Sequence, residues 1–192
     1  MAESLPRRVV VGITGASGIP YAKDLLETLR RAPDVEVHLV ATDGARRVAA
    51  DELGTTLEEL SALAHVVHPN KDIGASIASG SFRTLGMVVV PCSATTLSKV
   101  AYGVCDNLVT RAAYVHLKER RPLVLVPREA PLPLPTLEAM VKAAQAGATI
   151  LPASPGFYTR PQSIADLLGF VTQRVLDLLG IEADRAPRWK EG

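Results

Sequence analysis

The sequence predicts an α/β protein built on a doubly wound parallel β-sheet with helices on both faces. Apolar, β-branched runs of strand length alternate along the chain with segments of helical periodicity. These runs are almost continuously apolar, as strands buried on both faces require. Strands that alternate with helices form right-handed crossovers around one sheet. We therefore expect a single Rossmann-like or flavodoxin-like domain.

The elements follow in order along the chain. The expected strands are residues 8–13, 35–41, 86–91, 122–127 and 148–153. After the first strand, Ala22, Leu25, Leu26 and Leu29 recur at helical spacing. The other expected helices are residues 46–53, 56–64, 95–103, 107–120, 135–147 and a long amphipathic helix at about 162–179. Residues 180–192 are expected to form an extended tail.

Length and charge narrow the class of protein. The 192 residues, 47% of them hydrophobic, suffice for one packed domain over residues 1–192. Lys and Arg total 21 against 20 Asp and Glu, so no net field favours nucleic acid or an anionic membrane as partner. The start is polar, and the apolar runs are too short to span a bilayer. We expect a cytoplasmic protein.

Metal binding is not indicated by the cysteines and histidines. Cys92 and Cys105 form no CxxC motif and are expected to be reduced, buried thiols. His65 and His68 have a ligand-like spacing, but no carboxylate or cysteine lies near them in the sequence. We therefore expect no metal.

A glycine-rich turn, "GITGASG", follows the first expected strand. It lacks the G-x-G-x-x-G spacing of dinucleotide-binding proteins and the Lys-Ser/Thr of a Walker loop. Gly15, Ala16 and Ser17 still offer backbone N–H groups and a hydroxyl to a planar or anionic ligand. The alternative is a tight strand-to-helix turn that binds nothing.

A second polar cluster, "PCSATTLSK", follows the strand at residues 86–91. Ser93, Thr95 and Thr96 stand at an expected helix N-terminus, where hydroxyls also serve as ordinary caps. In a doubly wound sheet, however, two such strand ends lie side by side at the crevice that binds ligands. Two hydroxyl-rich strand ends favour a phosphorylated cofactor.

Charged side chains cluster around the fourth expected strand. Lys118 lies at the end of the preceding helix, and Arg128 and Glu129 come just after the strand, where catalytic residues of α/β sheets collect. The alternative is a salt-bridged surface pair. Tyr158 lies in a Pro/Gly loop, and Arg174 lies on the C-terminal helix.

Taken together, the motifs resemble those of UbiX-type flavin prenyltransferases, within the flavin-binding decarboxylase-like flavoproteins. The resemblance covers essentially the whole chain. Each motif alone is weak, but their order is specific. They are "GITGASG", "ASGSF", "PCSATTLS", "DNLVTRAA", "LKERRPLVLVPREAPL", "PGFYTRPQS", "RVLDLLGI" and "PRW".

The resemblance implies a reaction and its partners. The family joins a dimethylallyl group from dimethylallyl monophosphate to N5 and C6 of reduced FMN, without a metal. A UbiD-type decarboxylase receives the prenylated FMN. Members of the family are dodecamers, so we expect a homo-oligomer. A metal-free allylic phosphate leaves only if cations and hydrogen bonds neutralise it, which Arg, Lys and Tyr can do.

The resemblance also assigns roles to residues of this chain. It places Gly15, Ala16 and Ser17 on the flavin, with Ser17 near N5. The further FMN contacts that it implies are Thr42, where the family has serine, Ser93, Ala94, Thr95, Thr96 and Arg128. The prenyl phosphate falls to Lys118, Arg128, Tyr158 and Arg174.

Proton transfer falls to two carboxylates and a hydroxyl. The resemblance places Glu52 and Glu129 near the reacting atoms. Either Glu129 or the released phosphate takes the proton that leaves the flavin ring, and Glu52 with Ser17 handles the proton at N5. Trp189 either offers an aromatic face to the allyl cation or anchors the tail.

Two alternatives stay open. An FMN-dependent cysteine-type decarboxylase on the same fold shares "DNL", but carries a histidine after the first helix and a Pro-x-Met-Asn-type motif, which this sequence lacks. A non-enzymatic FMN carrier would not need Lys118, Glu129, Tyr158 and Arg174 around a second phosphate.

Overall fold

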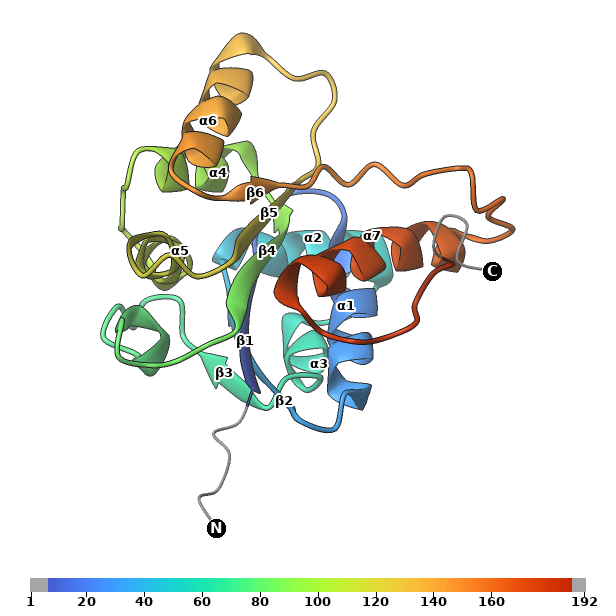
Figure 1. Ribbon diagram of the computed structural model, residues 1–192, viewed down its shortest axis with the longest axis horizontal. Helices are drawn as coiled ribbons and strands as arrows, with labels where there is room; N and C mark the ends of the chain where they lie inside the picture. Colours follow the sequence, from blue (N-terminus) through green and yellow to red (C-terminus); the bar gives the residue numbers. More distant parts are fainter. Residues whose placement is uncertain (1–6, 188–192) are drawn as a thin grey trace.

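A six-stranded parallel sheet organises the computed structural model, which describes residues 7–187 (Figure 1). The strands lie in the order β3-β2-β1-β4-β5-β6. They are β1 (Arg7–Ile13), β2 (Val35–Ala41), β3 (Val66–His68), β4 (Gly86–Cys92), β5 (Leu123–Pro127) and β6 (Thr149–Ile150). The predicted fold class is therefore confirmed.

Helices cover both faces of the sheet (Figure 1). One face carries α1 (Ile19–Arg31), α2 (Asp43–Leu53), α3 (Leu57–Ser61) and α7 (Ile164–Leu179). The other face carries η1 (Ser76–Ala78), α4 (Ala94–Ala101), α5 (Leu108–Lys118) and α6 (Leu134–Gln145).

The apolar runs are continuous because the central strands are buried on both sides. On β1, Val9, Val11 and Ile13 pack into the core under α1 and α7, whereas Val10 packs into the core under α5. All four side chains are completely buried. A polar residue at any of these positions would face a core, whichever way it pointed.

The strand order creates one switch point. From β1 the chain moves outward through β2 to β3, then returns to place β4 on the other side of β1. Crossovers therefore leave β1 and β4 in opposite directions and open a crevice beyond their carboxyl ends. The two glycine- and hydroxyl-rich loops of the sequence follow these two strands.

The short strand β3 is absent from the sequence-based prediction, because its three residues, two of them exposed, are too few to show a strand pattern. The histidines of the "HVVH" segment have structural partners. His65 accepts a hydrogen bond from the Val37 N–H through Nδ1 at 3.0 Å, and His68 Nε2 lies 2.9 Å from His38 Nδ1. Within residues 7–187, no group of three or more potential ligating side chains is placed to hold a metal.

The described segment that follows α7 is anchored to the fold. Helix α7 begins at Ile164 behind a Ser163 capping box, close to the predicted start. Arg185 then forms an ion pair with the largely buried Asp24 on α1, so the segment beyond the helix is held against the fold. Residues 188–192, with Trp189, lie outside the described residues. No helix within residues 7–187 is long and apolar enough to cross a membrane.

Candidate functional site

The loops that follow β1 and β2 are in backbone contact at the carboxyl edge of the sheet. A Cβ atom on Gly15 would lie 3.0 Å from the Cα atom of Gly44, which is tighter than nine in ten real Cβ contacts and would push the Gly44 backbone away by a few tenths of an ångström. Glycine is needed here for close approach. The contact brings Thr42, the N-cap residue of α2, next to the first loop.

Thr14 joins the ends of β1 and β4. Its side chain is completely buried, and its Oγ1 hydroxyl donates a hydrogen bond to the Pro91 carbonyl oxygen at 2.7 Å. Thr14 Oγ1 also accepts a hydrogen bond from the Ser93 N–H at 2.8 Å. The two candidate ligand loops are thus connected through the Thr14 hydroxyl, together with a longer hydrogen bond from the Thr14 N–H to the Pro91 carbonyl oxygen at 3.3 Å.

The N-terminus of α1 is occupied by a side chain of the protein itself. The Glu52 carboxylate accepts hydrogen bonds from the Gly18 N–H at 2.9 and 3.0 Å and from the Ile19 N–H at 2.9 Å. Gly18 can present its N–H this way because it adopts a positive φ of 117°. A carboxylate at the positive end of the helix dipole leaves no place there for a second anion.

The N-terminus of α4 is capped differently. Ser93 accepts a hydrogen bond from the Thr96 N–H through Oγ at 3.2 Å, and its own hydroxyl donates to Thr96 Oγ1 at 3.1 Å. Within residues 7–187, no acceptor bonds the N–H groups of Ala94 and Thr95. These two donors, at the positive end of the α4 dipole, are available to an anion.

Arg128 brings a positive charge to the same edge. It follows β5, is half-buried, and donates from Nε to the Ser17 carbonyl oxygen at 3.0 Å. The neighbouring Glu129 is exposed, and its carboxylate accepts a hydrogen bond from the Ala130 N–H at 3.2 Å. The structure therefore places Arg128 beside the glycine loop and leaves the Glu129 carboxylate at the surface. Both residues directly follow the strand, as predicted, but they form no ion pair with each other within residues 7–187.

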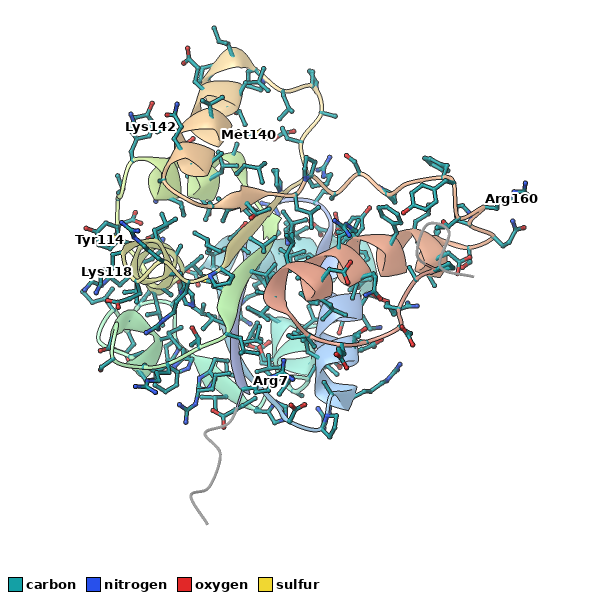
Figure 2. The ribbon with its side chains drawn as sticks, in the orientation of Figure 1. Arg7, Tyr114, Lys118, Met140, Lys142 and Arg160 are labelled. Carbon is teal, nitrogen blue, oxygen red and sulfur yellow. The ribbon has the colours of Figure 1, made fainter. Side chains whose placement is uncertain are left out.

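Lys118 does not lie with this group within one chain. It ends α5 and pairs with Glu119 close to Gly80, whereas the candidate site lies beyond the carboxyl ends of the strands. The reason is topological. Lys118 precedes β5, so it lies near the amino ends of the parallel strands, whereas the candidate site lies beyond their carboxyl ends. Figure 2 shows Lys118 and Arg160, whose loop carries Tyr158, on opposite sides of the molecule.

The other predicted phosphate contacts lie on or near α7. The Tyr158 ring packs edge to face against Phe170, with 5.6 Å between ring centroids. Arg174 is exposed and pairs with Asp177 at 2.9 Å. A single chain thus brings together the predicted flavin contacts and Glu52. It does not bring together the complete phosphate clamp, the set of residues predicted to bind the prenyl phosphate, namely Lys118, Arg128, Tyr158 and Arg174.

The remaining motif residues at this edge have structural explanations. Burial raises the pKa of the Cys92 thiol to about 12, so the thiol stays protonated near neutral pH and is no nucleophile. In "DNL", Asn107 caps α5 by accepting a hydrogen bond from the Thr110 N–H at 3.0 Å. Asp106 pairs with Lys99 at 2.5 Å.

Two site-shaping residues were missed from the sequence, namely Thr14 and Gly44. Thr14 carried one readable signal, since it is a polar residue directly after a fully apolar strand. Gly44 carried none, because its closeness to Gly15 depends on how two loops meet.

Comparison with known proteins identifies the class. The family model described as "Flavoprotein" matches residues 2–175. The flavin prenyltransferase UbiX of Deinococcus radiodurans is 58% identical over 190 residues, which are 99% of this chain and 97% of that protein.

Solved structures agree with the sequence match. AnUbiX in complex with FMN and dimethylallyl pyrophosphate superposes with a TM-score of 0.94 at 42% identity, covering 98% of this chain and all of that one. A dodecameric FMN-dependent UbiX-like decarboxylase from Escherichia coli O157:H7 gives 0.92 at 44% identity, covering 95% and 99%. This chain belongs to the flavoprotein family and, within it, to the UbiX-type flavin prenyltransferases.

Proposed function

We propose that this protein is a flavin prenyltransferase that joins the dimethylallyl group of dimethylallyl monophosphate to N5 and C6 of reduced FMN without a metal. The observation that carries the proposal is the pair of helix N-termini at the switch point. One is filled by Glu52, and the other leaves the Ala94 and Thr95 N–H groups available. This arrangement fits a mononucleotide, which brings one phosphate, better than a dinucleotide.

The flavin fits this edge in one orientation. Its phosphate would be held at α4 by the N–H groups of Ala94 and Thr95, with the hydroxyls of Ser93 and Thr96 close by, while Thr42 lies beside the glycine loop. Its ring system would lie on the loop of Gly15, Ala16 and Ser17, where side chains are too small to obstruct a planar group. When bound, the reduced flavin supplies the nucleophilic ring atoms of the reaction.

Arg128 is placed to serve the leaving phosphate of the prenyl donor. Its Nε is held by the Ser17 carbonyl oxygen, which directs the guanidinium toward the flavin loop. A fixed cation of this kind stabilises the charge that develops on a departing phosphate. Glu129, the next residue in the chain, accepts the proton that must leave the flavin ring. Glu52 with Ser17 handles the proton near N5.

Lys118, Tyr158 and Arg174 complete the phosphate clamp when copies of the chain assemble. Lys118 is too far from its own site, so it acts at the site of a neighbouring copy. We propose a homo-dodecamer, like the relative from Escherichia coli O157:H7. Exposed apolar side chains support extensive contacts between copies. They include Leu134 and Val141 on α6 and Phe157 and Ile164 near the start of α7.

Three further parts of the proposal rest on the family resemblance and the sequence pattern. Residues 1–192 form one flavoprotein domain. The protein acts in the cytoplasm. Its product is handed to a UbiD-type decarboxylase.

The test is incubation of the purified chain with FMN, a reductant and dimethylallyl monophosphate, followed by mass spectrometry of the extracted flavin. The expected result is a flavin heavier by one dimethylallyl substituent. A parallel incubation with the pyrophosphate measures donor preference. A flavin of unchanged mass with both donors would overturn the proposal, leaving an FMN carrier if binding persists. Release of carbon dioxide from a cysteine-terminated peptide would indicate the decarboxylase instead.

A further inference from the structure

Thr14 occupies a position between the two ligand loops without belonging to either. Its hydroxyl donates its only proton to the Pro91 carbonyl oxygen and accepts the Ser93 N–H. Both bonds are short, and the side chain has no exposed surface. The hydroxyl orientation is therefore determined by β4 on one side and by the residue that caps α4 on the other.

The two loops are held in different ways. The loop from Gly15 to Gly18 is also fastened by Glu52 at Gly18 and Ile19, and by Arg128 at Ser17. The start of α4 has no comparable fastening to β1 other than Thr14, among the contacts of residues 7–187. The direction of the Ala94 and Thr95 N–H groups relative to the glycine loop therefore depends on the Thr14 hydroxyl.

We propose that Thr14 is a positioning residue, whose hydroxyl sets the spacing between the glycine loop and the N-terminus of α4 so that one FMN molecule contacts both at once. The inference rests on the proposed function, because it takes FMN as the ligand. A ligand that spans two elements binds more tightly when their spacing is already correct, since binding then orders nothing further. Each loop on its own needs no such spacing.

The test compares ligands that span both loops with ligands that do not. Thr14→Val keeps the shape and the backbone hydrogen bond from the Thr14 N–H to Pro91, and it removes both hydrogen bonds of the hydroxyl. We expect the Kd of FMN to rise about tenfold, as for the loss of one buried hydrogen-bonding group. Riboflavin lacks the phosphate and reaches only the glycine loop, so its Kd should change by less than about twofold. Thr14→Ser keeps the hydroxyl and should restore FMN affinity.

Thr172→Val is the matched control. Thr172 is another buried threonine, and its Oγ1 donates to the Asp24 carboxylate at 2.6 Å, in the interface of α1 and α7. Its loss should lower the unfolding temperature without changing the ratio of FMN to riboflavin affinity. Flavin fluorescence quenching and thermal unfolding of the full chain measure all of these quantities.

Several outcomes would overturn the positioning role. They are a Thr14→Val chain that binds FMN like the wild type, one that loses FMN and riboflavin affinity equally, and one that fails to fold. The last result would show that the hydroxyl serves the whole fold rather than the spacing of two loops. If the wild type prenylates FMN while Thr14→Val changes nothing, only this inference fails. If the wild type does not bind FMN, the proposed function fails with it.

Discussion

The two helix N-termini at the switch point have opposite relations to an anion. At α1 the Glu52 carboxylate, delivered from α2, already accepts the N–H groups of Gly18 and Ile19. At α4 the neutral Ser93 takes the Thr96 N–H and leaves two others available. Both ends carry a partial positive charge, yet only one can take a phosphate from solution. A glycine-rich turn after a strand is therefore no guarantee of a phosphate site.

The difference assigns distinct tasks to the two loops. The α1 end can bring a carboxylate of fixed orientation close to a ligand lying on Gly15, Ala16 and Ser17. The α4 end can bind the phosphate of that ligand. In the proposed function, proton transfer and phosphate binding would thus take place beyond the ends of the neighbouring strands β1 and β4, which the Thr14 hydroxyl connects.

The largest expected effect comes from Glu52→Gln. Glutamine keeps an oxygen that can accept the helix N–H groups, but it cannot carry a proton between groups. The rate of flavin prenylation should fall about 10²- to 10⁴-fold, measured in single turnovers with dimethylallyl monophosphate.

Glu59→Gln is the control for Glu52→Gln, because Glu59 accepts the Thr56 N–H at 2.9 Å in the capping box of α3. It should change stability slightly and leave the rate alone. Equal rates for the two variants would reduce Glu52 to a helix cap.

The next effect tests the contact between the first loop and its neighbour. In Gly44→Ala the new methyl group would lie 3.1 Å from Gly15 Cα, so one backbone must shift. We expect a loss of about 1–3 kcal/mol in unfolding free energy, the usual cost of overpacking, together with weaker FMN binding. Denaturant titration and flavin titration measure the two.

Gly74→Ala serves as the comparison for Gly44→Ala, since its Cβ would lie 3.6 Å from the Asp72 carboxylate, an ordinary contact. A Gly44→Ala chain as stable as Gly74→Ala would mean that the two loops can separate freely.

A smaller effect sharpens the assignment of the phosphate to α4. Ser93→Ala removes the N-cap and should cost about 0.5–2 kcal/mol of stability, and FMN binding should weaken because the Ala94 and Thr95 N–H groups lose their fixed direction. Ser163→Ala removes the equivalent cap of α7, where Ser163 accepts the Asp166 N–H at 3.2 Å. It should cost similar stability and leave FMN affinity unchanged. Identical FMN affinities in both variants would place the phosphate elsewhere.

The last and most gradual effect is a pH dependence of stability that arises away from both helix ends. Burial lowers the pKa of His116 from 6.5 to about 4. Its Nδ1–H donates to the Ala112 carbonyl oxygen at 2.7 Å, and Nε2 accepts from the Thr84 hydroxyl at 2.8 Å. Between pH 6.5 and 4 the unfolded chain binds a proton that the folded chain excludes, so stability should fall as pH falls.

The slope from this one group is at most about 1.4 kcal/mol per pH unit. It should be absent above pH 6.5 and should disappear in His116→Gln, as followed by chemical denaturation at a series of pH values. A wild-type slope that survives in the variant would trace acid sensitivity to other groups.

Most of the fold could be predicted from local sequence patterns. The runs around Val9–Ile13 and Val35–Ala41 read as doubly buried strands because both faces of a central parallel strand must be apolar, whatever covers them. β3 was not predicted, because a strand of three residues at the edge of the sheet, two of them exposed, does not need to be apolar on both faces. The hydroxyls of Ser93 and Thr96 likewise predicted the start of a helix, because capping depends only on residues close in the sequence.

What the sequence by itself determined is therefore the order of the elements and the polar character of each strand end. These depend on neighbours within a few residues. Tertiary structure alone decided that Glu52 fills the α1 end, that Arg128 meets Ser17, and that Lys118 lies at the far edge. Each of these facts depends on where distant segments come to lie. Such contacts depend on the order of the strands in the sheet and on how the helices pack across it, and a local pattern of charge or hydropathy contains neither.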